Sequence, residues 1–165
     1  MASVDDMLDQ VVRREGPFNH LAADRGGATN WGITQSTLSA WLKRPATVDD
    51  VRALTPEHAK AIYAALYYER PRIDLLPDPV DDCVFDFAVN SGPFIAIRAL
   101  QESLGVTPDG VIGPQTLAAS IAAPIHAQLV GITKWRCMML ARIVRRDPSQ
   151  AVFISGWLKR ALEWI

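Results

Sequence analysis

The fold of this chain is decided by residues 14–34, which read Arg14-Glu15-Gly16-Pro17-Phe18-Asn19-His20-Leu21-Ala22-Ala23-Asp24-Arg25-Gly26-Gly27-Ala28-Thr29-Asn30-Trp31-Gly32-Ile33-Thr34. The stretch follows a helical pattern, so Glu15 is predicted at the last turn of a helix, where Gly16 lets the backbone turn with positive φ. Gly26-Gly27 predicts a tight turn, and Thr29 to Ile33 predicts a short β segment. The local prediction is a helix, an acid, and a hairpin that carries a second acid, Asp24.

The rest of the chain is predicted to be almost entirely helical. Apolar residues at helical spacing indicate a helix over residues 4–14, with Ser3 as its N-cap. Three later helices are expected to begin at threonine N-caps, namely Thr34, Thr47 and Thr55. Further helices are predicted over residues 80–89, 94–104, 114–122, 124–146 and 147–164. The polar, glycine-rich hairpin is unsuited to a core, and we expect it to hold side chains at a cleft.

The composition fits one domain, or one domain with a small appendage. Hydrophobic residues make up 49% of the 165 positions, which is ample for a core. No apolar run approaches the ~18 residues of a membrane span, and no signal peptide is visible at the N-terminus. Cys83 and Cys137 fall in apolar helical patterns and are expected to be reduced core residues. The histidines His20, His58 and His126 lack ligand spacing, so the sequence predicts no metal and no cofactor.

Five motifs follow one another along the chain. They are Glu15-Gly16 with Asp24 to Thr34, Ile62-Tyr63 with Tyr67-Tyr68, Phe85 to Gly92, Ala99 to Leu117, and Phe153 to Arg160. In this order they resemble the motifs of glycoside hydrolase family 108, the N-acetylmuramidases of phages and bacteria in the lysozyme superfamily. Pro17 departs from the family's usual glycine, and Arg25 stands where proline is frequent. Neither departure removes a group that the chemistry needs.

The resemblance implies an α+β, mostly α, lysozyme-like fold with one small β-hairpin near the active site. Residues 1–92 would form a catalytic lobe with the hairpin and a central helix. Residues 93–165 would form a helical lobe resembling a peptidoglycan-binding segment, packed with the first as one globular unit. The implied activity is that of a peptidoglycan hydrolase, which cleaves the β-1,4 bond between N-acetylmuramic acid and N-acetylglucosamine and lyses bacteria.

The chemistry needs a carboxylic acid that stays protonated near neutral pH, which a desolvated setting provides. Glu15 is the predicted acid; its alternative is a solvated glutamate at a helix end. Asp24 is predicted as the second carboxylate, and Thr29 as the residue that holds the attacking water. The alternative for Asp24 is a turn-capping carboxylate that accepts from the glycine pair.

Six side chains are predicted to contact the sugars: Asn19, Trp31, Tyr63, Tyr67, Asp86 and Asn90. Asp86 and Asn90 fall one turn apart on one helix face, and an amide offers both a donor and an acceptor. Asn90 has the alternative of a helix C-cap, and Tyr63 and Tyr67 have the alternative of ordinary core aromatics.

Two other functions stay open beside the muramidase. One is a lytic transglycosylase on the same fold, and the other is a peptidoglycan-binding protein without activity. As an endolysin, the expected monomer would wait in the host bacterial cytoplasm until a holin releases it to the periplasm and cell wall. No nucleic-acid partner and no stable membrane insertion are expected.

The charge is distributed unevenly, about −5 through Gly92 and about +4 from Pro93 onward. Seven cations of the last two predicted helices are expected to face solvent: Lys134, Arg136, Arg142, Arg145, Arg146, Lys159 and Arg160. The apolar positions 135, 138, 139 and 143 would face inward. Our hypothesis is that this basic face anchors the polyanionic wall, against the alternative of solubilising charges.

Overall fold

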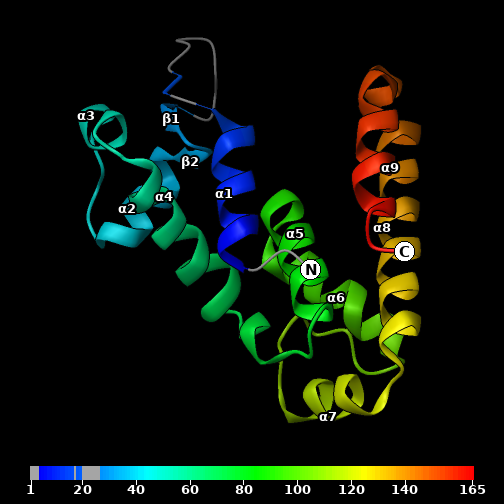
Figure 1. Ribbon diagram of the computed structural model, residues 1–165. Helices are drawn as coiled ribbons and strands as arrows, with labels where there is room; N and C mark the ends of the chain where they lie inside the picture. The colour runs from blue at the N-terminus through cyan, green and yellow to red at the C-terminus, as the bar shows by residue number, and fades with distance from the viewer. Residues whose placement is uncertain (1–3, 17, 20–26) are drawn as a thin grey trace. The chain divides into compact units, whose positions relative to one another are not determined.

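The computed structural model describes residues 4–16, 18–19 and 27–165, with the backbone alone for Arg14 and Glu15. The chain divides into two compact units, Met1–Leu66 and Tyr67–Ile165 (Figure 1). The predicted N-cap Ser3 lies outside the described residues. The two lobes expected at 1–92 and 93–165 were defined by sequence motifs, and these units are defined by compactness. The lobes therefore stay a prediction.

The first unit holds a small hairpin among helices. These elements are α1 (Val4–Glu15), β1 (Thr29–Asn30), β2 (Ile33–Thr34), α2 (Gln35–Leu42), α3 (Val48–Arg52) and α4 (Pro56–Tyr63). The two strands are antiparallel, with Thr29 opposite Thr34 and Asn30 opposite Ile33. Helix α1 packs on α4, and its apolar positions Met7, Leu8, Val11 and Val12 are buried, as their helical spacing predicted. An ion pair between Asp9 and Lys60 joins the same two helices.

The three predicted threonine N-caps are confirmed. The hydroxyl of Thr34 accepts from the backbone N–H of Thr37 at 3.1 Å and starts α2. Thr47 and Asp50 form the predicted capping box at α3. Thr55 starts α4, with Pro56 in the first turn. Each cap satisfies backbone donors that a helix cannot pair internally, and is typically worth about 1 kcal/mol.

The turn of the hairpin differs from the prediction. The segment predicted as one β stretch, Thr29 to Ile33, is two strands joined by Trp31 and Gly32, whose φ angles are +53° and +75°. Two central residues with positive φ match the handedness of a hairpin. The expected Gly26-Gly27 turn falls partly outside the described residues; Gly27 has a φ of +72°. A tryptophan is an unusual residue for positive φ, and for this reason composition alone pointed to the glycine pair.

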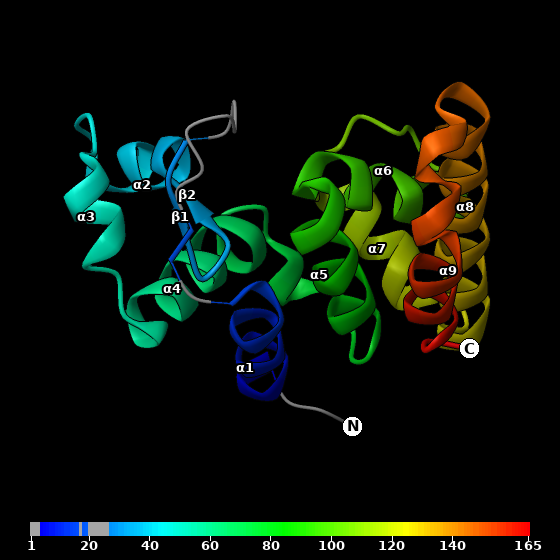
Figure 2. The same cartoon turned by 90° about the horizontal axis from the view of Figure 1, so that it is seen from above.

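The second unit is helical throughout its regular elements. They are η1 (Ala64–Glu69), which begins in the first unit, η2 (Ile73–Leu75), α5 (Val80–Ser91), α6 (Pro93–Leu104), α7 (Pro114–Ala122), α8 (Ile125–Arg146), η3 (Pro148–Phe153) and α9 (Ile154–Leu162). Helix α5 packs on α6 and α8, and α9 lies along α8 (Figure 2). Phe85, Phe87 and Leu100 are completely buried. The predicted central buried helix over 80–89 is therefore confirmed as α5, two residues longer.

Two predictions about the C-terminal helices are wrong. The helix expected over 147–164 is split, because the Asp147 carboxylate accepts from the backbone N–H of Ser149 and favours a 3-10 turn before α9. Helix α8 also turns a different face inward. Its buried residues are Gln128, Leu129, Ile132, Thr133, Arg136 and Leu140, whereas Met138 is 50% exposed.

A glutamine organises the loop between α6 and α7. The buried Gln101 amide donates to Asp109 Oδ1 at 2.7 Å and to Thr116 Oγ1 at 3.0 Å, and its oxygen accepts from the Gly110 N–H at 2.8 Å. Gly110 has a φ of +75°, and a Cβ there would meet the Phe94 ring at 2.2 Å. The motif from Ala99 to Leu117 thus has a structural explanation.

Among the described residues, no single helix has the length and apolar content of a membrane span; α7 and α8 reach them only as a pair bent by 117°.

Candidate functional site

The first candidate region lies where α1 ends. Glu15 is the last residue of the helix, and Gly16 follows with a φ of +73°, as predicted. The carbonyl oxygen of Gly16 accepts a hydrogen bond from the backbone N–H of Trp31 at 3.0 Å. This bond attaches the hairpin turn to the residue that follows Glu15. The Glu15 side chain lies outside the described part of the chain, and so does all of Asp24.

A second contact joins the segment after Gly16 to the hairpin. Asn19 and Thr29 form a β-bridge, in which each backbone N–H donates to the other residue's oxygen at 2.8 and 2.9 Å. The Thr29 hydroxyl also donates to the Asn19 carbonyl oxygen at 3.5 Å. The structure therefore brings three predicted site residues, Asn19, Thr29 and Trp31, beside the end of α1. Their predicted roles toward water and sugar stay predictions.

Asn30, which no sequence pattern singled out, holds the hairpin on α3 and the loop after it. The side chain is buried, and its amide nitrogen lies 3.0 Å from the oxygen of Val51, 3.2 Å from that of Arg52 and 3.1 Å from that of Leu54. The Trp31 indole N–H donates to the same Leu54 oxygen at 3.2 Å. A buried amide that serves three carbonyls keeps groups satisfied that would otherwise destabilise the fold. The available signal was an asparagine within the predicted β segment, since asparagine is depleted in strands.

Tyr63 and Tyr67 fall in different units. Tyr63 ends α4 and is only 4% exposed, which favours the core-aromatic alternative. Tyr67 is half-buried in η1, a π-helical turn, and belongs to the second unit. Asp86 and Asn90 lie in the second unit too, on α5. Both tyrosines make interactions with neighbouring groups, and their stacking on sugars stays a prediction.

Asp86 joins three helices of the second unit. Its Oδ2 accepts from Nη1 of Arg136 on α8 at 2.7 Å, and its Oδ1 accepts from Nη2 and Nε of Arg160 on α9 at 2.7 and 2.9 Å. The Arg136 guanidinium also lies 4.9 Å from the centre of the Phe87 ring, a cation–π contact. Both carboxylate oxygens are therefore occupied. This geometry favours a positioning role for Asp86, beside its predicted contact with substrate.

The ion pair corrects the predicted basic face. Arg136 is only 5% exposed, and the Arg160 side chain is 20% exposed, because Asp86 draws both inward. Five of the seven cations do face solvent: Lys134, Arg142, Arg145, Arg146 and Lys159. Two guanidiniums against one carboxylate leave a net charge of about +1 at this point of the fold.

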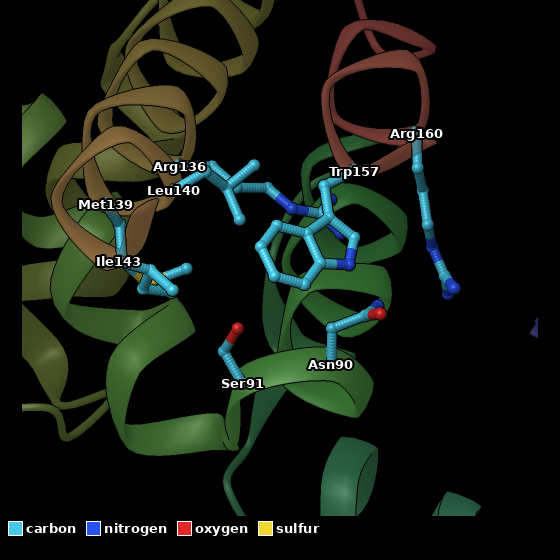
Figure 3. A pocket seen from close by; sticks show the side chains of 8 residues that line it. All are labelled: Asn90, Ser91, Arg136, Met139, Leu140, Ile143, Trp157 and Arg160. Atoms are coloured by element: carbon cyan, nitrogen blue, oxygen red, sulfur yellow. The ribbon is translucent and has the colours of Figure 1, made fainter. Parts of the chain in front are cut away.

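A pocket opens beside this ion pair. It has a volume of about 170 Å³ and is lined by Asn90, Ser91, Arg136, Met139, Leu140, Ile143, Trp157 and Arg160. Figure 3 shows the Trp157 ring between Arg160 on one side and Met139 and Ile143 on the other, with Asn90 and Ser91 at the end of α5 below it. The pocket thus combines an aromatic ring, an aliphatic wall and a cationic side. Asn90 is exposed and its amide donates to the Asp86 backbone oxygen at 2.6 Å; the C-cap of α5 is Gly92.

An acidic cluster lies at the start of α5. Among the described residues, Asp78, Asp81 and Asp82 have carboxylate oxygens within 4.8 Å of one another, a spacing that a cation could bridge. Burial, and then the charges of Asp81 and Asp78, raise the pKa of Asp82 to about 6. The Tyr68 hydroxyl donates to Asp81 Oδ2 at 2.6 Å. A proton on Asp82 relieves the repulsion in mild acid, and we assign no metal to the cluster.

The arrangement matches known proteins over both parts of the chain. The family model described as Glycosyl hydrolase 108 matches residues 8–92, and the model described as Predicted Peptidoglycan domain matches residues 95–162. The solved structure of SagA from Brucella abortus is similar, with a TM-score of 0.79 and 35% sequence identity over 98% of this chain and 94% of that one. No match is found among curated proteins.

These matches confirm the predicted mostly helical, lysozyme-like α+β fold with one small hairpin. They also confirm a glycoside hydrolase that acts on peptidoglycan, with a second sequence segment of the peptidoglycan-binding type. The chain belongs to the glycosyl hydrolase 108 family.

Proposed function

We propose that this chain is an N-acetylmuramidase, which cleaves the β-1,4 bond between N-acetylmuramic acid and N-acetylglucosamine with Glu15 as general acid. The observation that carries the proposal is the backbone around Gly16. Glu15 ends a helix whose apolar face is buried and packs on α4, and the next residue is hydrogen-bonded to the hairpin turn. A general acid must be held within hydrogen-bond reach of the leaving oxygen, and a rigid helix end provides such a support.

The proposed reaction starts with transfer of the Glu15 carboxyl proton to the glycosidic oxygen. The bond from that oxygen to the anomeric carbon then breaks, and positive charge develops on the sugar ring. Asp24 would stabilise this charge or activate the incoming water, and Thr29 would hold that water. Water supplies a hydroxyl to the anomeric carbon and returns a proton to the carboxylates. Asn19 and Trp31, which lie beside the end of α1, would contact the glycan.

The proposal also covers where the protein acts and how it reaches its substrate. The substrate lies outside the cytoplasmic membrane, so an endolysin made in the host bacterial cytoplasm needs a route to the periplasm and cell wall. We propose that it is a monomer and that a holin supplies this route. Expression in intact cells should then give lysis only when a permeabilising agent or a holin is added. Lysis without either would overturn this part, and analytical ultracentrifugation checks the monomer.

The test of the activity is the substitution Glu15→Gln, which keeps the shape and removes the transferable proton. Because general acid catalysis contributes about 10²–10⁴-fold, we expect peptidoglycan hydrolysis to fall at least about 100-fold, with thermal stability nearly unchanged. Glu163→Gln, at an exposed position near the C-terminus, is the matched control and should retain full activity.

Mass spectrometry of the released fragments identifies the reaction. A muramidase leaves a reducing N-acetylmuramic acid end, whereas a lytic transglycosylase leaves an anhydro end that is lighter by one water. Detection of anhydro ends would show that the chain is a lytic transglycosylase and would overturn the proposed muramidase activity. Full activity of Glu15→Gln would show that another residue is the acid.

A further inference from the structure

The pocket of the second unit has three kinds of wall that a ligand would meet together. Trp157 presents an aromatic ring, Met139 and Ile143 present aliphatic surface, and Arg160 presents a guanidinium (Figure 3). Ser91 and Asn90 add a hydroxyl and an amide at the end of α5. The lining comes from α5, α8 and α9, the three helices that the Asp86 ion pairs hold together. The site is therefore built on rigid elements.

The charge of the pocket favours an anion. Arg160 uses Nε and one terminal nitrogen for Asp86, and its Nη1 has no acceptor among the described residues. With Arg136 also bound to Asp86, the three groups keep a net charge of about +1. A guanidinium binds carboxylates through directed N–H donors, and partial burial strengthens such hydrogen bonds.

The volume of the pocket suits a small ligand group. A volume of about 170 Å³ compares with roughly 300–1,000 Å³ for sites that enclose a drug-sized molecule. One alanine residue with a free carboxylate is a small group that fits within this space. The aliphatic wall suits a methyl group, which gains from leaving water.

We propose that this pocket binds a carboxylate that stands beside a methyl group, the chemistry of a free alanine end of a peptidoglycan stem peptide. The carboxylate would meet Arg160, and the methyl group would lie on Met139 and Ile143 against Trp157. The same chemistry occurs in the lactyl group of muramic acid from which the peptide has been removed. The inference rests on the proposed function, since it takes peptidoglycan as the source of the ligand.

The sharpest variant is Ile143→Glu, which adds a negative charge to the pocket wall and leaves the Asp86 ion pairs intact. Ile143 is 36% exposed, so the substitution does not bury a charge. Ile143→Gln has the same shape without the charge and is the matched control. Met138→Glu adds the same charge on α8 at a 50% exposed position outside the pocket. Circular dichroism and melting temperature verify that each variant folds.

Binding is measured with the full chain in the Glu15→Gln background, so that no glycan is cleaved. The probes are N-acetyl-D-alanyl-D-alanine, its C-terminal amide, and peptide-free glycan with lactyl carboxylates, followed by NMR at the tryptophan indole N–H signals. We expect the acid to shift the Trp157 signal and the amide not to. Ile143→Glu should weaken binding at least about tenfold, while Ile143→Gln and Met138→Glu should change it less than about threefold.

The possible results distinguish the two sources of the ligand, and they distinguish failure of this inference from failure of the proposed function. Binding of the dipeptide acid supports the stem peptide, and binding of the peptide-free glycan alone supports the same chemistry with the lactyl group as source. Absence of binding by both probes, or equal binding by the Glu and Gln variants at position 143, would overturn the inference. The proposed function fails by a different result, the absence of muramidase products from the unsubstituted chain.

Discussion

The hairpin of the first unit and the Asp86 cluster of the second unit are held by different forces. In the hairpin, neutral donors on Asn30 and Trp31 reach backbone carbonyls, and the turn uses residues with positive φ. In the cluster, one carboxylate holds two guanidiniums from helices α8 and α9. Neutral bonds to the backbone fix the path of the chain with little dependence on salt or pH. Ion pairs between helices fix side chains and leave a charge that a ligand can use.

The comparison predicts the largest effect at Asp86. Asp86→Asn leaves Arg136, which is 5% exposed, without a carboxylate. Breaking a buried pair from one side costs about 3–5 kcal/mol, so urea unfolding should show a loss of that size. Asp49→Asn is the control, because its partner Arg52 and its own side chain are largely exposed. The control should lose no more than about 1 kcal/mol. Similar losses at both sites would show that burial does not make the Asp86 ion pairs stronger than an exposed pair.

The next effect is expected at Asn30, in the region of neutral bonds. Asn30→Ala removes the amide that lies near three carbonyl oxygens, and a buried polar group left unsatisfied costs about 1–3 kcal/mol. Asn30→Asp should be worse, because it brings a carboxylate toward those oxygens. Melting temperatures give the order of the three proteins, and hydrolysis should fall in the same order if the hairpin carries the site. An Ala variant as stable as the unsubstituted protein would show that the amide donors are unimportant.

The pH dependence of stability adds a third case to the comparison, the buried carboxylate of Asp82, which has no arginine partner among the described residues. The pKa of Asp82 is raised from its ordinary value of 3.8 to about 6, chiefly by burial. Between these values the folded chain binds more protons than the unfolded chain, so the free energy of unfolding falls as pH rises through this window. Asp82→Asn should therefore raise the free energy of unfolding at pH 8 by on the order of 2 kcal/mol, and the melting temperature should rise with it. This gain should vanish near pH 4. A gain that does not depend on pH would point to packing instead of charge.

The smallest effect is expected at Trp31, and it tests the strain in the hairpin turn. With φ at +53°, alanine carries the penalty of a Cβ in the left-handed region and glycine does not. Trp31→Gly should thus be more stable than Trp31→Ala by about 1 kcal/mol, although both lose the indole hydrogen bond to Leu54. Thermal unfolding of the pair measures this difference. The reverse order would mean that the turn relaxes when the indole is removed.

Local signals accounted for most of the helices. Thr34, Thr47 and Thr55 were predictable as N-caps because each accepts from a backbone N–H only three residues ahead. Gly16 was predictable at a helix end because glycine adopts positive φ without steric cost, and its φ is +73°. The turn at Trp31 was not predictable in this way. Its conformation is stabilised by bonds to Gly16 and Leu54, which lie far away in the sequence.

The sequence by itself determined the order of the elements, the helix starts, the family motifs and the position of Glu15 at a helix end, since these depend on neighbours within a few residues. Only the tertiary structure decided which face of α8 is buried, that Arg136 and Arg160 converge on Asp86, and that Asn30 serves the carbonyls of Val51, Arg52 and Leu54. Arg136 and Asp86 are separated by 50 residues. A buried cation is stable only beside its partner, and no local sequence pattern predicts an ion pair between residues so far apart.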